Sequence, residues 1–565
     1  MEDKVLSFRN SDLAEAYCSV ADRRAAEGDL VGELSVFFSA LKNCKEQDSA
    51  EMLANIADCY SRMELYELSN QYWFYCLDKK YLSGDLSEAY GELSANFYCT
   101  DDIWTSAYYL KQKADINPED VYSVDPETVK NMFREISEGV ATYNIVYPYD
   151  RADYSERKKQ ARRAFSSNAY GIAAACYSSI PEECRDENED GELAMAYFFS
   201  KEDDKAIAAC KNSIKKSGEN LTACCNLSTI YGEIGEDDKS AYYYAKALSL
   251  KKGARDEDFK LASCAVERGD HLTARNCLAS TLKERPYDIT LRFFYALSML
   301  NLGENERGCE QLSECYKLNP EDYIIGWYSE QAKKLVAGEK TDVKLPFRYE
   351  KDLPEKVIRR YEKIFCAYLD GRRTGVTLKE MLGIARVCVY CSDELVARRA
   401  LYIIAHYDKK DASLAFLKKT LLDCAIGQSL KTLAVHLLVD LGCKDRVGVL
   451  TGRFYMSLKL RRLPFEKNDP VGDTFIQAYG YAVSYLIFFG VEDTDKMLFK
   501  LNRIYTERKQ IFSRNEIRPD ELAAAAVFES GYKELSKLPS VGKLFGIKTK
   551  RLSAVIEMLK GDNND

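Results

Sequence analysis

Four equally spaced segments decide the fold: LAMAYFF at 193–199, LSTIYGEIG at 227–235, LASCAVERG at 261–269 and YALSMLNLG at 295–303. The interval between successive starts is constant, and the last three segments end on glycine. Apolar residues three and four apart are typical of one face of a helix. A glycine at a helix end permits the positive φ of a tight turn. The sequence therefore predicts a repeated pair of antiparallel helices.

The second helix of each pair keeps the same spacing. Its inner face carries small residues that allow close packing: Ala206, Ser240, Ala274 and Gly308. Pro286 and Pro320 end the last two units, because proline lacks the amide hydrogen that a helix needs. This pattern, with its period of about 34 residues, resembles the tetratricopeptide repeat (TPR) family. The resemblance implies a right-handed α-solenoid whose first helices line a concave groove for protein or peptide segments.

The remaining sequence is divided by its periodicity. The TPR array is predicted at 156–338, with its best units at 187–322, and weaker TPR-like helical hairpins are predicted at 1–119. An irregular insertion at 120–155 breaks the period. A linker is predicted at 339–353, where little periodicity remains.

The C-terminal part has a different pattern. Residues 354–443 resemble HEAT-type helical repeats, although no strict period supports them. Residues 444–463 carry β-branched and aromatic residues on both sides of Thr451 and Gly452, which predicts one small β-hairpin. Helices resume in a C-terminal module at 474–565. We therefore expect an all-α protein: a TPR-type α-solenoid followed by a second helical domain with one small β-hairpin.

The net charge of −9 is unevenly divided. Residues 1–350 carry 43 Lys and Arg against 62 Asp and Glu, a net charge of −19, whereas residues 351–565 carry 37 against 27, a net charge of +10. Parts of opposite charge favour different ligands. We therefore expect the two parts to meet different partners.

Cysteine usage favours a cytoplasmic protein. The 19 cysteines are odd in number and lie mostly singly in apolar helical patterns, as expected in a reducing compartment. The start of the chain, MEDKVLSFRN, contains no apolar stretch, so no secretory signal is expected. The uncharged run at 474–491 reaches membrane-spanning length but contains three tyrosines, and we interpret it as a buried helix.

The groove of the array is the first candidate binding site. In the TPR clamp for C-terminal carboxylates, Asn226 would match the central asparagine, but Gly191, Met195 and Asp256 replace three of its polar partners. We therefore expect an apolar or amphipathic ligand segment instead. The candidate groove residues are Met195, Phe198, Asn226, Phe259, Lys260, Phe293 and Phe294. The alternative is that some of the aromatic residues simply pack between hairpins.

The C-terminal end of the chain offers a different function. KLPSVGKLFGIKTKRLSAVIEML at 537–559 resembles a helix-turn-helix. Gly542 would lie at a close helix contact, and Lys548, Lys550 and Arg551 would face phosphates or bases. The alternative is an ordinary three-helix cap with a solvated lysine face.

Motifs for metal binding and catalysis are incomplete. DENEDG at 186–191 opens like an EF-hand loop, but Tyr197 stands where the bidentate glutamate is needed. Cys388 and Cys391 form a single CxxC in an apolar helical run, which favours core thiols over zinc. No nucleotide-binding, zinc-protease or serine-hydrolase motif is found, so no enzyme, cofactor or metal is expected.

These observations lead to two hypotheses. The first is a cytoplasmic protein–protein interaction scaffold, in which a TPR solenoid binds a protein or peptide segment in its concave groove, without membrane binding. The second is a TPR-containing regulator that binds nucleic acid through the basic C-terminus.

Overall fold

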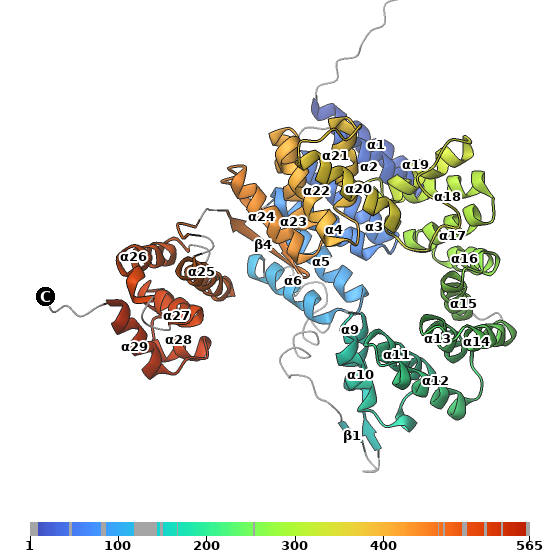
Figure 1. Ribbon diagram of the computed structural model, residues 1–565, viewed down its shortest axis with the longest axis horizontal. Helices are drawn as coiled ribbons and strands as arrows, with labels where there is room; N and C mark the ends of the chain where they lie inside the picture. Colours follow the sequence, from blue (N-terminus) through green and yellow to red (C-terminus); the bar gives the residue numbers. More distant parts are fainter. Residues whose placement is uncertain are drawn as a thin grey trace, which may run out of the picture. The chain divides into compact units, whose positions relative to one another are not determined.

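The computed structural model describes residues 10–43, 48–80, 86–117, 144–146, 151–166, 168–251, 255–460, 463–466, 469–488, 494–512, 517–532 and 535–560. The chain forms two compact units, Met1–Leu460 and Arg461–Asp565. The first unit contains helices α1 to α24, shown in Figure 1, and the second contains α25 to α29. The predicted all-α fold with TPR-type helix pairs is confirmed.

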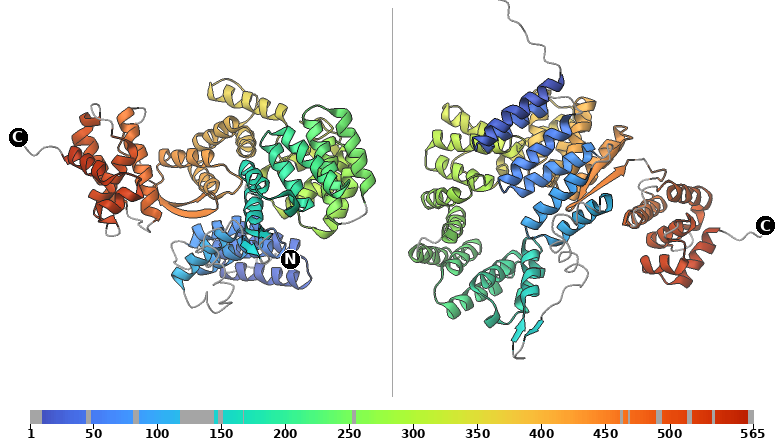
Figure 2. Two further views of the ribbon diagram at one scale, coloured as in Figure 1. Left: turned by 90° about the horizontal axis from the view of Figure 1, so that it is seen from below. Right: turned by 180° about the vertical axis from the view of Figure 1, so that it is seen from behind.

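The repeated helix pairs follow one another along the chain (Figures 1 and 2). The array consists of α9 (Ser155–Ser166), α10 (Tyr170–Ser178), α11 (Glu187–Phe199), α12 (Asp203–Ser217), α13 (Leu221–Glu233), α14 (Asp237–Leu250), α15 (Arg255–Arg268), α16 (His271–Glu284), α17 (Ile289–Asn301), α18 (Asn305–Leu318) and α19 (Tyr323–Val336). A short 3-10 helix, η2 (Glu182–Cys184), precedes α11.

Glycines lie at the turns and at a close helix contact of these pairs. Gly235 and Gly303 have φ angles of +79° and +82° at the turns between first and second helices, as the sequence predicts. Gly308 is required by packing, because an added Cβ would lie 2.6 Å from Leu300 Cγ and 3.1 Å from the Ala296 carbonyl oxygen. The small-residue position of the repeat is therefore the place where the two helices touch.

Three further helix pairs precede the array. They are α1 (Asn10–Ala26) with α2 (Leu30–Asn43), α3 (Ser49–Arg62) with α4 (Tyr66–Lys80), and α5 (Ser87–Cys99) with α6 (Ile103–Ile116). Much of the predicted insertion lies outside the described residues. Within it, β1 (Asn144–Val146) and β2 (Arg151–Asp153) pair antiparallel, a short ribbon that the sequence did not predict.

The first unit ends in five helices and a β-hairpin. These are α20 (Glu355–Leu369), α21 (Leu378–Cys388), α22 (Glu394–Tyr407), α23 (Lys410–Leu422), α24 (Gln428–Asp440), β3 (Arg446–Thr451) and β4 (Phe454–Lys459). The strands pair antiparallel from Arg446 with Lys459 to Thr451 with Phe454. The predicted hairpin is confirmed, and its tight turn is of the two-residue kind. This turn begins at Gly452, which has a φ of +61°.

The two ends of the first unit share one apolar core. Buried residues from 21–109 and from 289–460 form a single cluster. Hydrogen bonds join the same elements: the Tyr60 hydroxyl donates to the Leu318 carbonyl oxygen at 2.7 Å, and the Gly448 amide donates to Asp78 Oδ1 at 2.8 Å. The N-terminal hairpins therefore pack against the end of the array and the helices that follow it.

Charge explains part of this association. Residues 10–117 carry 9 Lys and Arg against 19 Asp and Glu, whereas residues 351–460 carry 20 against 12. The ion pair between Arg453 and Asp102 lies where these parts of the unit meet, and Lys419 Nζ pairs with Glu321 Oε1, at the end of the array, at 2.6 Å. The acidic N-terminal hairpins and the basic helices that follow the array therefore contact each other within the first unit.

The second unit is a separate helical bundle. It contains α25 (Pro470–Phe488), α26 (Asp495–Phe512), α27 (Pro519–Glu529), α28 (Leu538–Leu544) and α29 (Thr549–Lys560). The central helix α27 is buried from Glu521 to Val527. Phe475, Ala478 and Ala482 of α25 lie fully buried in this core, whereas Tyr481 of the same helix is 49% exposed, so one face of α25 packs into the bundle. Within the described residues, no helix combines the length and the apolar character needed to cross a bilayer.

Candidate functional site

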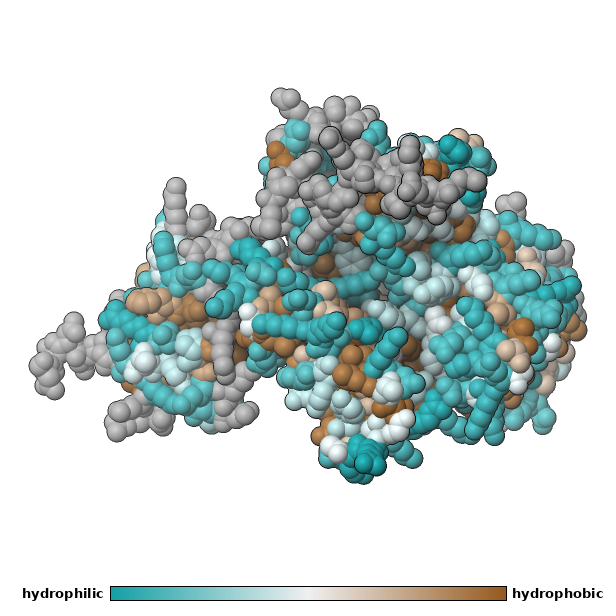
Figure 3. Space-filling model, turned by 90° about the horizontal axis from the view of Figure 1, so that it is seen from above, coloured by the Kyte–Doolittle hydropathy of each residue, from teal (hydrophilic) through white to brown (hydrophobic). Residues whose placement is uncertain are grey.

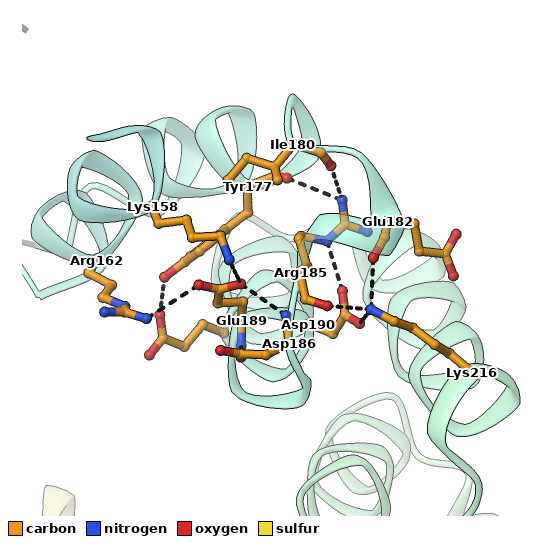
Figure 4. Close-up of polar contacts among 11 residues, drawn as sticks. Lys158, Arg162, Tyr177, Ile180, Glu182, Arg185, Asp186, Glu189, Asp190 and Lys216 are labelled. Atoms are coloured by element: carbon orange, nitrogen blue, oxygen red, sulfur yellow. Dashed lines mark hydrogen bonds and ion pairs between the residues drawn. The ribbon is translucent and has the colours of Figure 1, made fainter. Parts of the chain in front are cut away.

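A buried polar cluster fixes the start of the array's first good unit (Figure 4). The Asp186 carboxylate caps α11 by accepting a hydrogen bond from the Glu189 amide at 2.9 Å. In turn, the Glu189 carboxylate accepts a hydrogen bond from the Asp186 amide at 3.0 Å. Glu189 also pairs with Lys158 Nζ at 2.8 Å and with Arg162 at 3.3 Å. The DENEDG segment is therefore a capping box held by cations of α9.

The neighbouring Asp190 is held in the same way. Its Oδ1 accepts from Arg185 Nε at 2.8 Å, and Lys216 Nζ lies 3.4 Å from its Oδ2. Lys216 also donates to the Glu182 carbonyl oxygen at 2.7 Å, which ties α12 to η2. These carboxylates support the fold, because each of them is paired with a basic side chain.

Three of the predicted groove residues are used inside the fold. Phe293 is 0% exposed and packs edge-on against Tyr328 of the next pair at a ring distance of 5.1 Å. Asn226 is 4% exposed and donates to the Gly191 carbonyl oxygen at 3.2 Å, which links α13 to α11. Phe198 is also buried. Phe198 and Phe293 therefore pack inside the array, as the alternative interpretation stated for the aromatic residues, and the Asn226 carboxamide joins two first helices.

The other four predicted residues reach the surface to different degrees. Phe259 is 43% exposed and lies beside the Arg285 guanidinium at 5.7 Å. Met195, Lys260 and Phe294 are half-buried. Phe294 is in contact with a segment of the chain itself, which lies against this face of the array.

That segment is the connector, defined here as residues 341–353, which follows α19. The Asn301 carboxamide makes two hydrogen bonds with the Phe347 backbone. Asn301 Nδ2 donates to the Phe347 carbonyl oxygen at 2.9 Å, and the Phe347 amide donates to Asn301 Oδ1 at 2.6 Å. The Phe347 side chain is 4% exposed and packs against Tyr328 at 6.0 Å. The predicted linker is therefore bound to the first helices α17 and α19.

The connector is held at further points. The Tyr349 ring meets Phe294 edge-on at 6.0 Å, and its hydroxyl lies 2.8 Å from His271 Nδ1. Burial raises the pKa of Tyr349 to about 12 and lowers the pKa of His271, so both groups favour their neutral forms. The Tyr328 hydroxyl donates to the Asp352 carbonyl oxygen at 3.0 Å.

The repeat places equivalent residues on the first helices that precede α17. Asn301 corresponds, one and two repeats earlier, to Glu267 and Glu233, and Phe294 corresponds to Lys260. Glu233 and Glu267 are both exposed. We define the residues Thr229, Glu233, Lys260 and Glu267 as the acidic face of α13 and α15. These two glutamates were not among the residues predicted from the sequence, although their position in the repeat identifies them.

The two glutamates influence each other. Partial desolvation of the Glu267 carboxylate by the surrounding protein is the main cause that raises its pKa, and the negative charge of Glu233 raises it further, because both effects disfavour the charged form. The hydrogen bond from Thr229 and the positive charge of Lys260 act in the opposite direction. The Thr229 hydroxyl donates to Glu267. Within the described part of the chain, neither carboxylate has an ion-pair partner within 4 Å. A cation brought by a ligand would therefore be stabilised at this position.

Comparison with known proteins supports the repeat. No family model matches the chain. Over 257 residues it is 24% identical to the TPR repeat-containing protein YvcD of Bacillus subtilis (strain 168), an alignment that covers 45% of this chain and 51% of that protein. The chain thus spans about half the length of this curated relative. The resemblance to TPR proteins is confirmed.

Solved structures of TPR proteins are also similar to parts of the chain. YrrB, described as a TPR protein with an unusual peptide-binding site, is 15% identical with a TM-score of 0.23, covering 32% of this chain and 92% of YrrB. The TPR2AB domain of yeast Sti1, in a complex with pHSP90, is 15% identical with a TM-score of 0.21, covering 48% and 98%. The TPR domain of P58(IPK) is 14% identical with a TM-score of 0.24, covering 70% and 99%.

Outside the TPR array, one of the three C-terminal residues proposed for nucleic acid is used inside the fold. Arg551 forms two hydrogen bonds of 2.8 Å with the buried carboxylate of Glu521, so this cation is engaged in the fold. Lys548 and Lys550 are exposed. Residues 461–565 carry 17 Lys and Arg against 15 Asp and Glu, which is close to neutral. The charge of this unit therefore does not favour a nucleic-acid interface.

The structure also places the CxxC pair. Cys388 is fully buried and Cys391 nearly so, and burial raises the pKa of Cys391 to about 12. A thiol in this environment is neither a nucleophile nor a ready metal ligand at neutral pH. Among the described residues, no three His, Cys, Asp or Glu side chains are grouped to hold a metal ion.

Proposed function

We propose that this chain is a protein-interaction scaffold whose acidic face, on α13 and α15, binds an extended segment of another protein that carries basic side chains. The observation that carries the proposal is the register between Glu233, Glu267 and Asn301. In α17 this position contacts an extended peptide, the connector, and in α13 and α15 the same position presents a carboxylate.

Apolar contacts would complete the interface. Phe259 is exposed on α15, and Met195 is half-buried on α11, both in the first helices of the array. On the side of the molecule drawn in Figure 3, apolar side chains lie in small patches between hydrophilic ones. We therefore infer that charge selects the ligand segment and that a few apolar contacts add affinity.

Binding of short peptides to the full chain tests this proposal. A fluorescein-labelled peptide with alternating lysine and leucine should bind, and the same peptide with glutamine in place of lysine should bind about 5- to 30-fold more weakly, because two opposed carboxylates each contribute about 0.5–1 kcal/mol. The charged peptide should also lose affinity as salt concentration rises.

Variants locate the site. Replacing both carboxylates in Glu233→Gln and Glu267→Gln should reduce binding of the lysine peptide ~10-fold. The matched control is Asp238→Asn, which removes one negative charge from the exposed start of the second helix α14. Equal loss in the control, or full affinity in the double variant, would show that general charge rather than the acidic face binds the peptide.

A further inference from the structure

The connector reveals a second kind of ligand site. We propose that His271, Phe294, Asn301 and Tyr328 form a binding site for an extended segment with aromatic side chains two residues apart. The connector fills this site within its own chain, and a partner segment of the same pattern binds by displacing it. This site uses different residues from the acidic face, so the proposal stands or fails independently of the proposed function.

The connector contacts the array as a ligand does. Phe347 and Tyr349 point toward the helices, whereas Pro346, Arg348 and Glu350 are exposed. Over residues 346–350 the side chains alternate between the array and solvent, as they do in an extended strand, and backbone bends lie at 345–346 and 349. An extended peptide that gives its backbone to hydrogen bonds and its alternate side chains to pockets is a general mode of peptide recognition.

Different residues of the site contact the backbone and the aromatic rings of the connector. The Asn301 carboxamide satisfies both the amide and the carbonyl group of one residue, which any side chain at that position permits. Selectivity then comes from two aromatic positions: Tyr328 beside the first ring, and Phe294 with His271 around the second. Aromatic pairs add about 0.5–1.5 kcal/mol beyond the area that they bury.

The connector is also the reason that the site is closed to other ligands. A tethered segment competes at an effective concentration of about a millimolar. Anchors outside the site strengthen the tether, because Lys351 Nζ pairs with Asp322 Oδ2 at 2.6 Å and the Asp342 amide donates to Gln331 Oε1 at 2.8 Å. A partner must therefore match the aromatic pattern to displace the connector.

The test uses the full chain and the connector sequence as the probe. A labelled peptide with the sequence of residues 343–353 is titrated into the natural chain and into a double variant, Phe347→Ala with Tyr349→Ala. In the variant, the connector no longer places its two aromatic rings in the site and competes less well with the peptide. The variant should therefore bind the peptide at least ~10-fold more tightly than the natural chain does. The matched control, Leu345→Ala with Arg348→Ala, changes exposed connector side chains and should bind like the natural chain.

Two further arms define the site. Adding Asn301→Ala to the double variant should weaken peptide binding about 10-fold, because the two backbone hydrogen bonds are lost. A peptide with alanine at both aromatic positions should not bind. Equal affinity in the natural chain and the folded double variant, or an affinity that Asn301→Ala leaves unchanged, would overturn the proposal.

A second measurement covers the case in which the double variant does not fold. The natural chain is exposed to deuterated water with an excess of isotope-labelled connector peptide, so that mass distinguishes the two copies. Displacement should accelerate exchange in the chain's own residues 343–353 and leave α27 unchanged. Exchange in residues 343–353 that the peptide does not alter would overturn the proposal.

Discussion

Replacing Tyr109 by phenylalanine should open the contact between the N-terminal hairpins and the β-hairpin. Tyr109 is fully buried in α6, and its hydroxyl donates to the Arg453 carbonyl oxygen at 2.7 Å and accepts from the Tyr455 amide at 3.0 Å. Phenylalanine keeps the ring contact with Phe97 at 5.7 Å but removes both hydrogen bonds. The change therefore isolates the polar part of the contact.

The change in the free energy of opening follows from the two backbone groups that lose their hydrogen-bond partner, the Tyr455 amide and the Arg453 carbonyl. A buried amide that loses its partner costs about 1–3 kcal/mol, and the partly buried carbonyl adds about 1 kcal/mol. The free energy of opening should fall by about 2–4 kcal/mol, so the open population should rise at least ~30-fold.

Two assays follow this change. Urea unfolding measured by tryptophan fluorescence reports on the first unit, because Trp73, Trp104 and Trp327 all lie there. Hydrogen exchange in β3 and β4 reports on the contact itself.

The matched control is Tyr108→Phe. This half-buried neighbour meets Phe454 through its ring at 4.8 Å. Because phenylalanine keeps that ring, the control should lose less than about 0.5 kcal/mol. Equal exchange rates in the two variants would refute the idea that Tyr109 fastens the hairpin.

Two predictions concern the second unit, both measured by hydrogen exchange in α27 to α29. At Gly542 an added Cβ would lie 2.7 Å from the Ile547 carbonyl oxygen, whereas at Gly480 it would meet no neighbouring atom within 4 Å. Gly542→Ala should therefore destabilise the unit by about 1–3 kcal/mol, while Gly480→Ala should be neutral or stabilising; equal effects would contradict the packing argument. The hydrogen bond from Arg551 is the main cause that lowers the pKa of Glu521. This carboxylate therefore stabilises the fold above its ordinary pKa of about 4.3, and the contribution is lost as pH falls through the lowered value. Glu521→Gln should therefore reduce the loss of stability of the second unit as pH falls. A dependence of stability on pH that equals that of the natural chain would contradict this role of Glu521.

The repeat could be predicted because its information is local and periodic. Gly235 and Gly303 adopt the positive φ that their positions required, and Gly308 lies where no Cβ fits. The packing of the N-terminal hairpins could not be predicted in the same way. Tyr60 reaches a carbonyl 258 residues away, and a contact of this kind leaves no pattern in the sequence.

The site was predicted only in part for a related reason. Register places Phe293 and Phe294 on adjacent positions of one helix, but it does not show that Tyr328 covers the first while the connector contacts the second. The connector itself lacks periodicity, so the sequence indicated a linker. Arg551 was expected to face phosphates or bases, because nothing local in the sequence shows that Glu521 lies beside it.

The most direct test of the acidic face is a hydrogen-exchange footprint of the full chain with the lysine and leucine peptide. Bound peptide is expected to slow exchange in the first helices α13 and α15, and this protection should disappear when Glu233 and Glu267 are both replaced by glutamine. Protection confined to the second helices α14 and α16, or to residues 461–565, would contradict the account.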